Sequence, residues 1–229
     1  MNKSWLLILM ISSVLIVQGC MFDEKEERTL ALLDEQLLSA AEAKDTEGIV
    51  KLLQEGANVQ AQDQRGRTAL MIATYNHDTA SAQKLIEAGA DVNLQDDMLN
   101  SPFLYAGAEG YLDILKLAIQ AGADPSITNR YGGTALIPAS EHGYVEVVRE
   151  LLTQTSVDVN HVNRLGWTAL LEAIILNDGN KRQQETIELL IHHGADVNLA
   201  DGDGISPLSH AKAKGFKEIQ ALLIQAGAK

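Results

Sequence analysis

The chain has 229 residues, of which 46% are hydrophobic and only 4% aromatic, so its core must be built mainly from Leu, Ile, Val and Ala. The formal net charge of -13 argues against a nucleic-acid-binding protein, because counterion release from a polyanion needs a basic face. A single cysteine excludes an internal disulfide framework and a multi-cysteine metal site.

The first twenty residues have the pattern of an exported protein. Lys3 precedes an apolar run from residue 5 to residue 17, which has the length of the hydrophobic region of a signal peptide. A transmembrane helix needs about 20 apolar residues, so this run is too short to span a bilayer. The run leads into Val-Gln-Gly-Cys at 17–20, and Cys20 is the only cysteine of the chain.

This ending resembles the lipobox of bacterial lipoproteins. The resemblance implies that residues 1–19 are a signal peptide and that the Cys20 thiol receives a diacylglyceryl group. Several acyl chains on one residue anchor a protein stably, because each buried methylene contributes about 0.8 kcal/mol. Val17 and Gln18 depart from the commonest lipobox, which has leucine and a smaller residue there. An ordinary cleavable signal with an incidental cysteine is the alternative.

Residues 20–32 are predicted to form a lipidated tether, since positions 21–28 read MFDEKEER and are mostly charged. In enterobacterial lipoproteins, an aspartate directly after the cysteine retains the protein in the inner membrane. Met21 occupies that position. The resemblance therefore implies a lipoprotein of the bacterial cell envelope that faces the periplasm, with the outer membrane favoured.

A repeated pattern fills the rest of the chain. Gly-Ala-Asn or Gly-Ala-Asp begins at 56, 89, 122 and 194, and the first three copies are 33 residues apart. A second signature, Thr-Ala-Leu or Ser-Pro followed by Leu or Phe, begins at 68, 101, 134, 168 and 206. A fixed period of this length predicts stacked supersecondary units.

Each unit is expected to contain two short helices. The Thr or Ser of the second signature caps the first helix by accepting a hydrogen bond from a free backbone amide, and proline at the next position suits the first turn. Small side chains in that helix let neighbouring units stack closely: Ala73, Ala106, Ala139, Ala173 and Ala211. The Gly-Ala-Asp segment ends the second helix and turns the chain into a projecting hairpin, called here a finger.

Some positions depart from this pattern. Lys44 and His77 stand in inter-helix turns where glycine is expected, at a cost of up to about 1 kcal/mol each. Leu99 stands where most fingers have glycine, so we expect an irregular hairpin there. Pro138 lies close enough to the start of its helix to be tolerated. The fourth unit carries an insertion at 177–181, between its helices.

The signatures and their spacing resemble the ankyrin repeat from residue 33 to the C-terminus. The resemblance implies a mainly α fold, an ankyrin-repeat solenoid of helix-turn-helix units with β-hairpin fingers. Residues 33–63 contain only a helix pair and are predicted to form an N-terminal half-repeat cap within the ankyrin repeat domain, 33–229. The five repeats are placed at 64–96, 97–129, 130–163, 164–201 and 202–229. The fourth, with its inserted loop, is similar to a subgroup of exported bacterial ankyrin proteins.

We find no residue pattern typical of catalysis. His192 and His193 are adjacent on a helix, hence point about 100° apart and do not easily chelate one metal. Asp-Gly-Asp-Gly at 201–204 resembles the start of a calcium loop but lacks the distal glutamate. We therefore expect no catalytic residue, no metal site, no cofactor and no small-molecule substrate.

A protein partner is expected to bind the surface lined by the fingers and the first helices. Aromatic residues and arginines are enriched at binding hot spots, which favours the centre of the array. The candidate contact residues are Arg65, Tyr75, Met98, Leu99, Arg130, Tyr131, Arg164, Leu165, Trp167 and Glu172. Trp167 has the alternative of packing against its own finger.

These features predict a lipid-anchored periplasmic module that binds or regulates another cell-envelope protein. The alternative is an immunity or protective protein that neutralises a periplasmic toxin or guards a stress-sensitive enzyme. An enzyme would instead show convergent ionisable groups in a pocket. An effector injected into a host is disfavoured, because a lipobox retains a protein at the membrane. Ankyrin repeats provide a surface and no fixed ligand, so the partner stays open.

Overall fold

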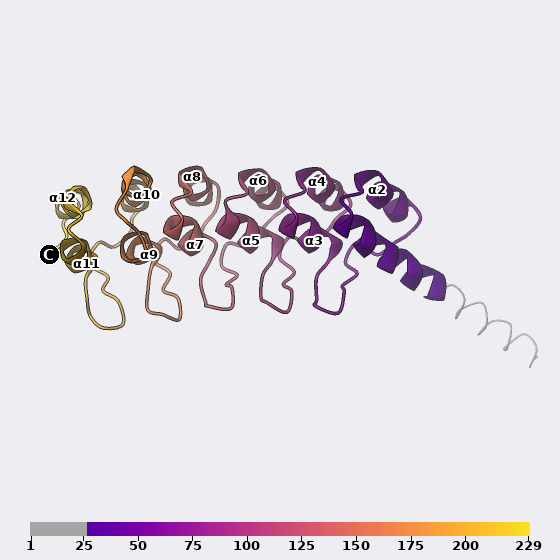
Figure 1. The fold of residues 1–229 in the computed structure, drawn as a ribbon, viewed down its shortest axis with the longest axis horizontal. Coiled ribbons are helices and arrows are strands. Elements are labelled where there is room, and N and C mark those ends of the chain that lie inside the picture. The colour runs from indigo at the N-terminus through magenta and orange to yellow at the C-terminus, as the bar shows by residue number, and fades with distance from the viewer. Residues whose placement is uncertain (1–26) are drawn as a thin grey trace, which may run out of the picture.

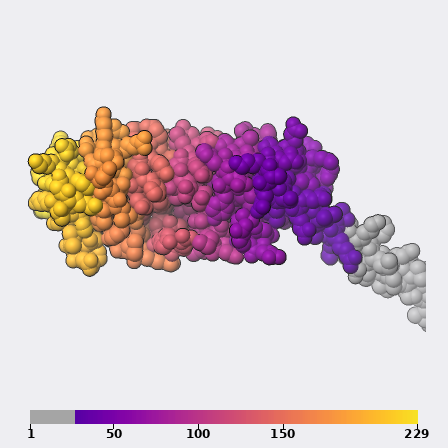
Figure 2. All heavy atoms as spheres, viewed as in Figure 1, coloured from indigo at the N-terminus to yellow at the C-terminus, as the bar shows by residue number. Residues whose placement is uncertain are grey.

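Two rows of short helices run along an elongated array (Figure 1). The computed structural model describes residues 27–229, and residues 27–42 are helical. The first row contains α3 (Ala69–Tyr75), α5 (Pro102–Glu109), α7 (Leu136–Glu141), α9 (Ala169–Ile175) and α11 (Pro207–Lys214). The second row contains α2 (Thr46–Gln54), α4 (Thr79–Glu87), α6 (Leu112–Gln120), α8 (Val145–Gln154), α10 (Lys181–His192) and α12 (Lys217–Gln225). Fingers project from the first row, and Figure 2 shows one continuous body.

Side-chain caps begin four of the first-row helices, as predicted. Each capping hydroxyl accepts a hydrogen bond from the backbone amide three residues further on, at 3.1 to 3.3 Å. Such a cap typically contributes about 1 kcal/mol. The capping residues are Thr68, Ser101, Thr168 and Ser206.

The third repeat is the exception, and the predicted cap at Thr134 is wrong. In the other repeats the carbonyl of the capping residue accepts the amide four residues further on, but here that residue is Pro138, which has no N–H. The Thr134 carbonyl accepts the amide of Ile137 instead, at 3.2 Å. In the other repeats the amide at this position, three residues after the capping residue, donates to the capping hydroxyl. Here the carbonyl accepts it instead, so the Thr134 Oγ1 is buried without a partner. Helix α7 consequently begins one residue later, at Leu136.

The core combines small alanines in the first row with large apolar side chains from both rows. The five alanines predicted to permit close stacking have no exposed surface: Ala73, Ala106, Ala139, Ala173 and Ala211. The second row contributes one fully buried leucine per repeat: Leu85, Leu115, Leu151, Leu190 and Leu223. Burying a leucine contributes about 1.5 to 3 kcal/mol. Because these side chains bury their surface against the next repeat, stability depends on neighbouring repeats.

All five fingers close in the same way. The Oδ1 of an Asp or Asn at each tip accepts two backbone amides: Asp63, Asp96, Asn129, Asn163 and Asp201. Three residues after it, four fingers have a left-handed glycine, and the second has Leu99 with φ of 57°. The predicted irregular hairpin is therefore wrong, since Leu99 adopts the left-handed backbone and the finger keeps its hydrogen bonds.

Two further residues, which stand in inter-helix turns where the repeat pattern has glycine, also adopt the left-handed backbone conformation. Lys44 has φ of 56° and His77 has φ of 49°. The Lys44 ammonium donates to the carbonyl of Asn76 in the next repeat at 2.8 Å. The His77 ring stacks on Tyr111, with 3.7 Å between ring centroids and 5° between the planes. These contacts between repeats offset part of the backbone cost.

The insertion in the fourth repeat joins that repeat to both of its neighbours. Asn180 caps α10. Asn177 Nδ2 donates to the carbonyl of Glu141 in the preceding repeat at 2.7 Å. Gly179 has φ of 71°, and a Cβ added to it would lie 2.8 Å from the ring of Phe216 in the following repeat. The inserted residues therefore contribute to stacking.

The N-terminal segment is described only from residue 27. Residues 27–32, assigned above to the tether, are helical, and their side chains are exposed. Cys20 and the predicted signal peptide at 1–19 lie outside the described residues. From residue 27 to the C-terminus, no helix is both long enough and apolar enough to cross a bilayer.

Candidate protein-binding surface

The fingers and the first-row helices together form one side of the array, called here the finger face. A hollow of about 510 Å³ lies at its middle, lined by α5, α7 and α9 and by fingers of the second to fourth repeats. Four of the predicted contact residues line this hollow: Arg130, Tyr131, Leu165 and Glu172. The predicted centre of the interface thus coincides with a concave site.

Exposed apolar side chains border the hollow. Tyr131 is 54% exposed and Leu165 is 58% exposed, at the tips of consecutive fingers. The Arg130 guanidinium lies 4.8 Å from the centroid of the Tyr131 ring. Arg164 fixes this pair, since its Nη1 donates to the Arg130 carbonyl at 2.8 Å and its backbone amide donates to the Tyr131 carbonyl at 3.0 Å. Binding to such a preorganised group costs less conformational entropy than ordering a free loop.

Glu172 is unusual because it is a carboxylate with only 6% of its surface exposed. Its Oε1 accepts a hydrogen bond of 2.7 Å from Asn163 Nδ2, and Asn163 is itself held by its finger amides. Burial raises the pKa of Glu172 to about 7, and the negative charge of Glu141 adds to this, whereas the bond from Asn163 opposes it. Near neutral pH the side chain is therefore present in both charge states.

The other candidate contact residues lie outside the hollow. Tyr75 is half-buried; its hydroxyl donates to Asp96 Oδ2 at 2.5 Å and accepts from Asn100 Nδ2 at 3.0 Å. Burial and the bond to Asp96 raise the pKa of Tyr75 to about 12. This tyrosine thus ties α3 to the next finger.

Of the remaining candidates, Arg65, Met98, Leu99 and Arg164 are exposed on the fingers. Trp167 is half-buried at the base of its finger, where its backbone amide donates to Asn163.

Sequence reasoning did not single out several residues that line the hollow. Among them are Tyr105, Pro138 and Leu176. Tyr105 and Pro138 occupy the same register position as Glu172, nine residues after the Asp or Asn of the finger. Reading that single position across the repeats would have identified both.

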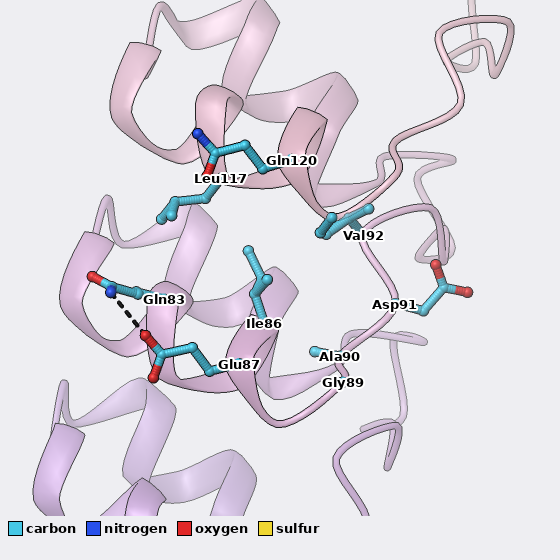
Figure 3. A pocket seen from close by; sticks show the side chains of 10 residues that line it. Gln83, Ile86, Glu87, Gly89, Ala90, Asp91, Val92, Leu117 and Gln120 are labelled. Carbon is cyan, nitrogen blue, oxygen red and sulfur yellow. Dashed lines mark hydrogen bonds between the residues drawn. The ribbon is translucent and has the colours of Figure 1, made fainter.

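A second groove, of about 580 Å³, lies between α4 and α6 (Figure 3). Its walls include Ile86 and Leu117, and Gln83 and Glu87 lie along its edge. A similar groove lies between α2 and α4. We interpret these grooves as the regular seam between second-row helices, which makes them weaker candidates than the hollow.

From residue 27 onwards, no group of three His, Cys, Asp or Glu side chains is placed to hold a metal ion. The rings of His192 and His193 are 77° apart in plane, and His193 Nδ1 lies 2.9 Å from the Leu189 carbonyl oxygen. His210 Nε2 lies 2.7 Å from Asp201 Oδ2, which joins α11 to its finger.

Two ankyrin repeat proteins match part of the chain in sequence. The chain is 52% identical over 82 residues to the ankyrin repeat protein YahD of Escherichia coli; the match covers 36% of this chain and 41% of that protein. A match to an ankyrin repeat protein of Rickettsia felis, 37% identical over 79 residues, covers 34% of this chain and 20% of that protein. The chain thus spans less than half the length of either curated relative.

The structural comparisons cover more of the chain. The crystal structure of an ankyrin repeat domain from Acinetobacter baumannii superposes with a TM-score of 0.83 at 54% sequence identity, covering 84% of this chain and 98% of that one. Another ankyrin repeat protein superposes with a TM-score of 0.81 at 40% identity and the same coverage. The family description "Ankyrin repeats (3 copies)" matches residues 15–96, 37–129 and 103–201. With its stacked helix pairs, capped fingers and these matches, the chain belongs to the ankyrin-repeat family.

Proposed function

We propose that this protein is a binding module that holds or regulates another protein of the bacterial cell envelope, without catalysing a reaction. The observation that carries the proposal is the hollow in the finger face with the exposed Tyr131 and Leu165 beside it. Tyrosine and arginine are frequent at the centres of protein interfaces, and Arg130 and Arg164 hold Tyr131 in place here. Ankyrin repeats act generally as protein-interaction modules, which agrees with this assignment.

We further propose that a lipid on Cys20 anchors the module to a membrane, on its periplasmic side and in the outer membrane. The signal-like residues 1–19 and the lipobox-like ending support this proposal. The chain between Cys20 and residue 27 can span at most about 25 Å. A lipid there would hold the N-terminal end of the array near the bilayer, and the finger face would extend away along the array.

Labelling with a radioactive or clickable fatty acid tests the anchor. The wild-type chain is expected to incorporate the label and to sediment with membranes, and Cys20→Ser is expected to lose both properties. Fractionation of inner and outer membranes then tests the sorting. A Cys20→Ser variant that still carries lipid would refute the anchor.

Capture of the partner from detergent-solubilised envelopes tests the binding surface. The double variant Tyr131→Ala, Leu165→Ala is expected to recover at least tenfold less partner than the wild type. Ile224→Ala is the matched control, since Ile224 is 56% exposed on α12 in the second row. Undiminished capture by the double variant, with an unchanged melting curve, would contradict the proposed surface. Capture of a toxin, or of an enzyme sensitive to stress, would favour the immunity or protective role over regulation.

A further inference from the structure

Three carboxylates from consecutive first-row helices line the hollow of the finger face. Glu109 lies on α5, Glu141 on α7 and Glu172 on α9. Within residues 27–229, none of the three forms an ion pair. Of the basic groups that also line the hollow, the Arg130 guanidinium lies over the Tyr131 ring, and His142 is the other. The three carboxylates of the hollow therefore outnumber its one guanidinium, and none of them is ion-paired within the described residues.

Glu172 is the most buried of the three carboxylates. The side chain is more than nine-tenths buried and lines the hollow. Its Oε1 is occupied by Asn163 Nδ2, but its Oε2 has no hydrogen-bond donor among the described residues. This oxygen is not one of the buried polar atoms left without a partner, so it is open to solvent, and charged donors make the strongest hydrogen bonds to a carboxylate. The free oxygen is thus suited to a cationic donor that arrives from outside.

Apolar side chains also line the hollow, beside these carboxylates. Tyr105 and Leu176 line it together with the fingertip residues Tyr131 and Leu165. Leu165 is 58% exposed and Leu176 is 49% exposed in the array. A long side chain with a methylene stem and a charged head would cover these apolar surfaces and place its charge at the carboxylates.

We propose that the hollow receives an arginine side chain of the protein partner, with the guanidinium at Glu172 and Glu141 and the methylene stem against Leu165 and Leu176. This inference rests on the proposed function and adds the chemistry of the partner. A guanidinium presents five donors in one plane, so it can serve carboxylates from two helices at once and still contact an aromatic ring. A lysine ammonium carries the same charge but lacks the planar arrangement of donors, and is expected to bind more weakly.

Selection of peptides from a random phage-displayed library on the immobilised full-length chain tests this inference. Peptides selected on the wild type are expected to share an arginine at one position. Synthetic versions of the same peptides, with citrulline in place of that arginine, are expected to bind at least tenfold more weakly. Lysine at that position is expected to fall between the two.

Variants of the array locate the interaction. Glu172→Gln keeps an acceptor for Asn163 and removes the charge, and Glu141→Gln removes the neighbouring charge. Each is expected to weaken the arginine peptides at least fivefold, whereas the exposed second-row control Glu218→Gln leaves their affinity unchanged. Melting curves confirm that each variant is folded.

Several results would overturn the inference. One is that the selected peptides contain no basic residue but still depend on Tyr131 for binding. Another is that the arginine peptides bind Glu172→Gln as tightly as the wild type. A third is that the library yields no peptide whose binding is sensitive to these glutamates. Envelope capture that depends on Tyr131 but not on Glu172 would remove this inference and leave the proposed function standing. If arginine peptides bind the hollow but no envelope protein is captured, the proposed function would fail and the preference of the hollow for arginine would stand.

Discussion

Replacing Glu172 by glutamine should make the stability of the array less dependent on pH. In the wild type the pKa of Glu172 is raised from 4.5 to about 7, first by burial and then by the charge of Glu141. A carboxyl group with a raised pKa binds its proton more tightly in the folded chain. Its contribution to stability is therefore complete below pH 4.5 and is lost as the pH rises through 7.

The magnitude follows from the shift. Each pKa unit corresponds to about 1.36 kcal/mol, so a group buried as deeply as Glu172 should destabilise the folded array by about 3 kcal/mol when fully ionised. Glutamine has nearly the same shape, accepts the bond from Asn163 and carries no charge. Glu172→Gln should therefore gain about 2 to 3 kcal/mol over the wild type at pH 8.5 and little at pH 4.5.

Urea unfolding followed by circular dichroism at several pH values measures this difference directly. The comparison must be made between variants, because ionisable groups elsewhere in the array act on both curves alike. A side-chain NMR titration of Glu172 gives the pKa itself, and Glu141→Gln should lower it. A free-energy difference between Glu172→Gln and wild type that stays constant from pH 4.5 to 8.5 would refute the reasoning.

Three further substitutions test the backbone features of the array. Leu99→Gly should stabilise the protein by about 0.5 to 1 kcal/mol in urea unfolding, because glycine adopts the left-handed backbone without strain; a clear loss of stability would contradict this. Pro138→Ala should raise the melting temperature by a few degrees, since it restores a helical amide and frees a donor for the unpaired capping hydroxyl; a lower melting temperature would show that the proline ring matters more. Gly179→Ala should cost about 1 to 3 kcal/mol through its φ of 71° and its contact with Phe216, whereas Gly202→Ala, with open space around it, should cost much less; equal losses would argue against the contact.

Much of the fold follows from the sequence because the determinants are local and repeat. The hydroxyl caps, the buried alanines such as Ala106, and the glycine-like turns at Lys44 and His77 each depend on a few neighbouring residues. The same pattern recurring every 33 residues predicts how the units stack. The errors at Thr134 and Leu99 also have local causes, a missing amide and a tolerated left-handed leucine.

The candidate site was only partly predictable. The sequence placed the exposed Tyr131 and Leu165 on consecutive fingers, and tertiary structure added the hollow beside them. Glu109, Glu141 and Glu172 occupy three different positions within their repeats, so no single-position pattern groups them.

The sequence by itself determined the repeated units, their caps and the residues available on the finger face. Only the tertiary structure decided that the carboxylates of Glu109, Glu141 and Glu172 share one hollow. It also decided that Glu172 is buried there beside Asn163. The physical reason is that a repeat fixes its own backbone through short-range hydrogen bonds. The environment of a charge, by contrast, depends on side chains supplied by neighbouring repeats, and it is their stacking that raises the pKa of Glu172.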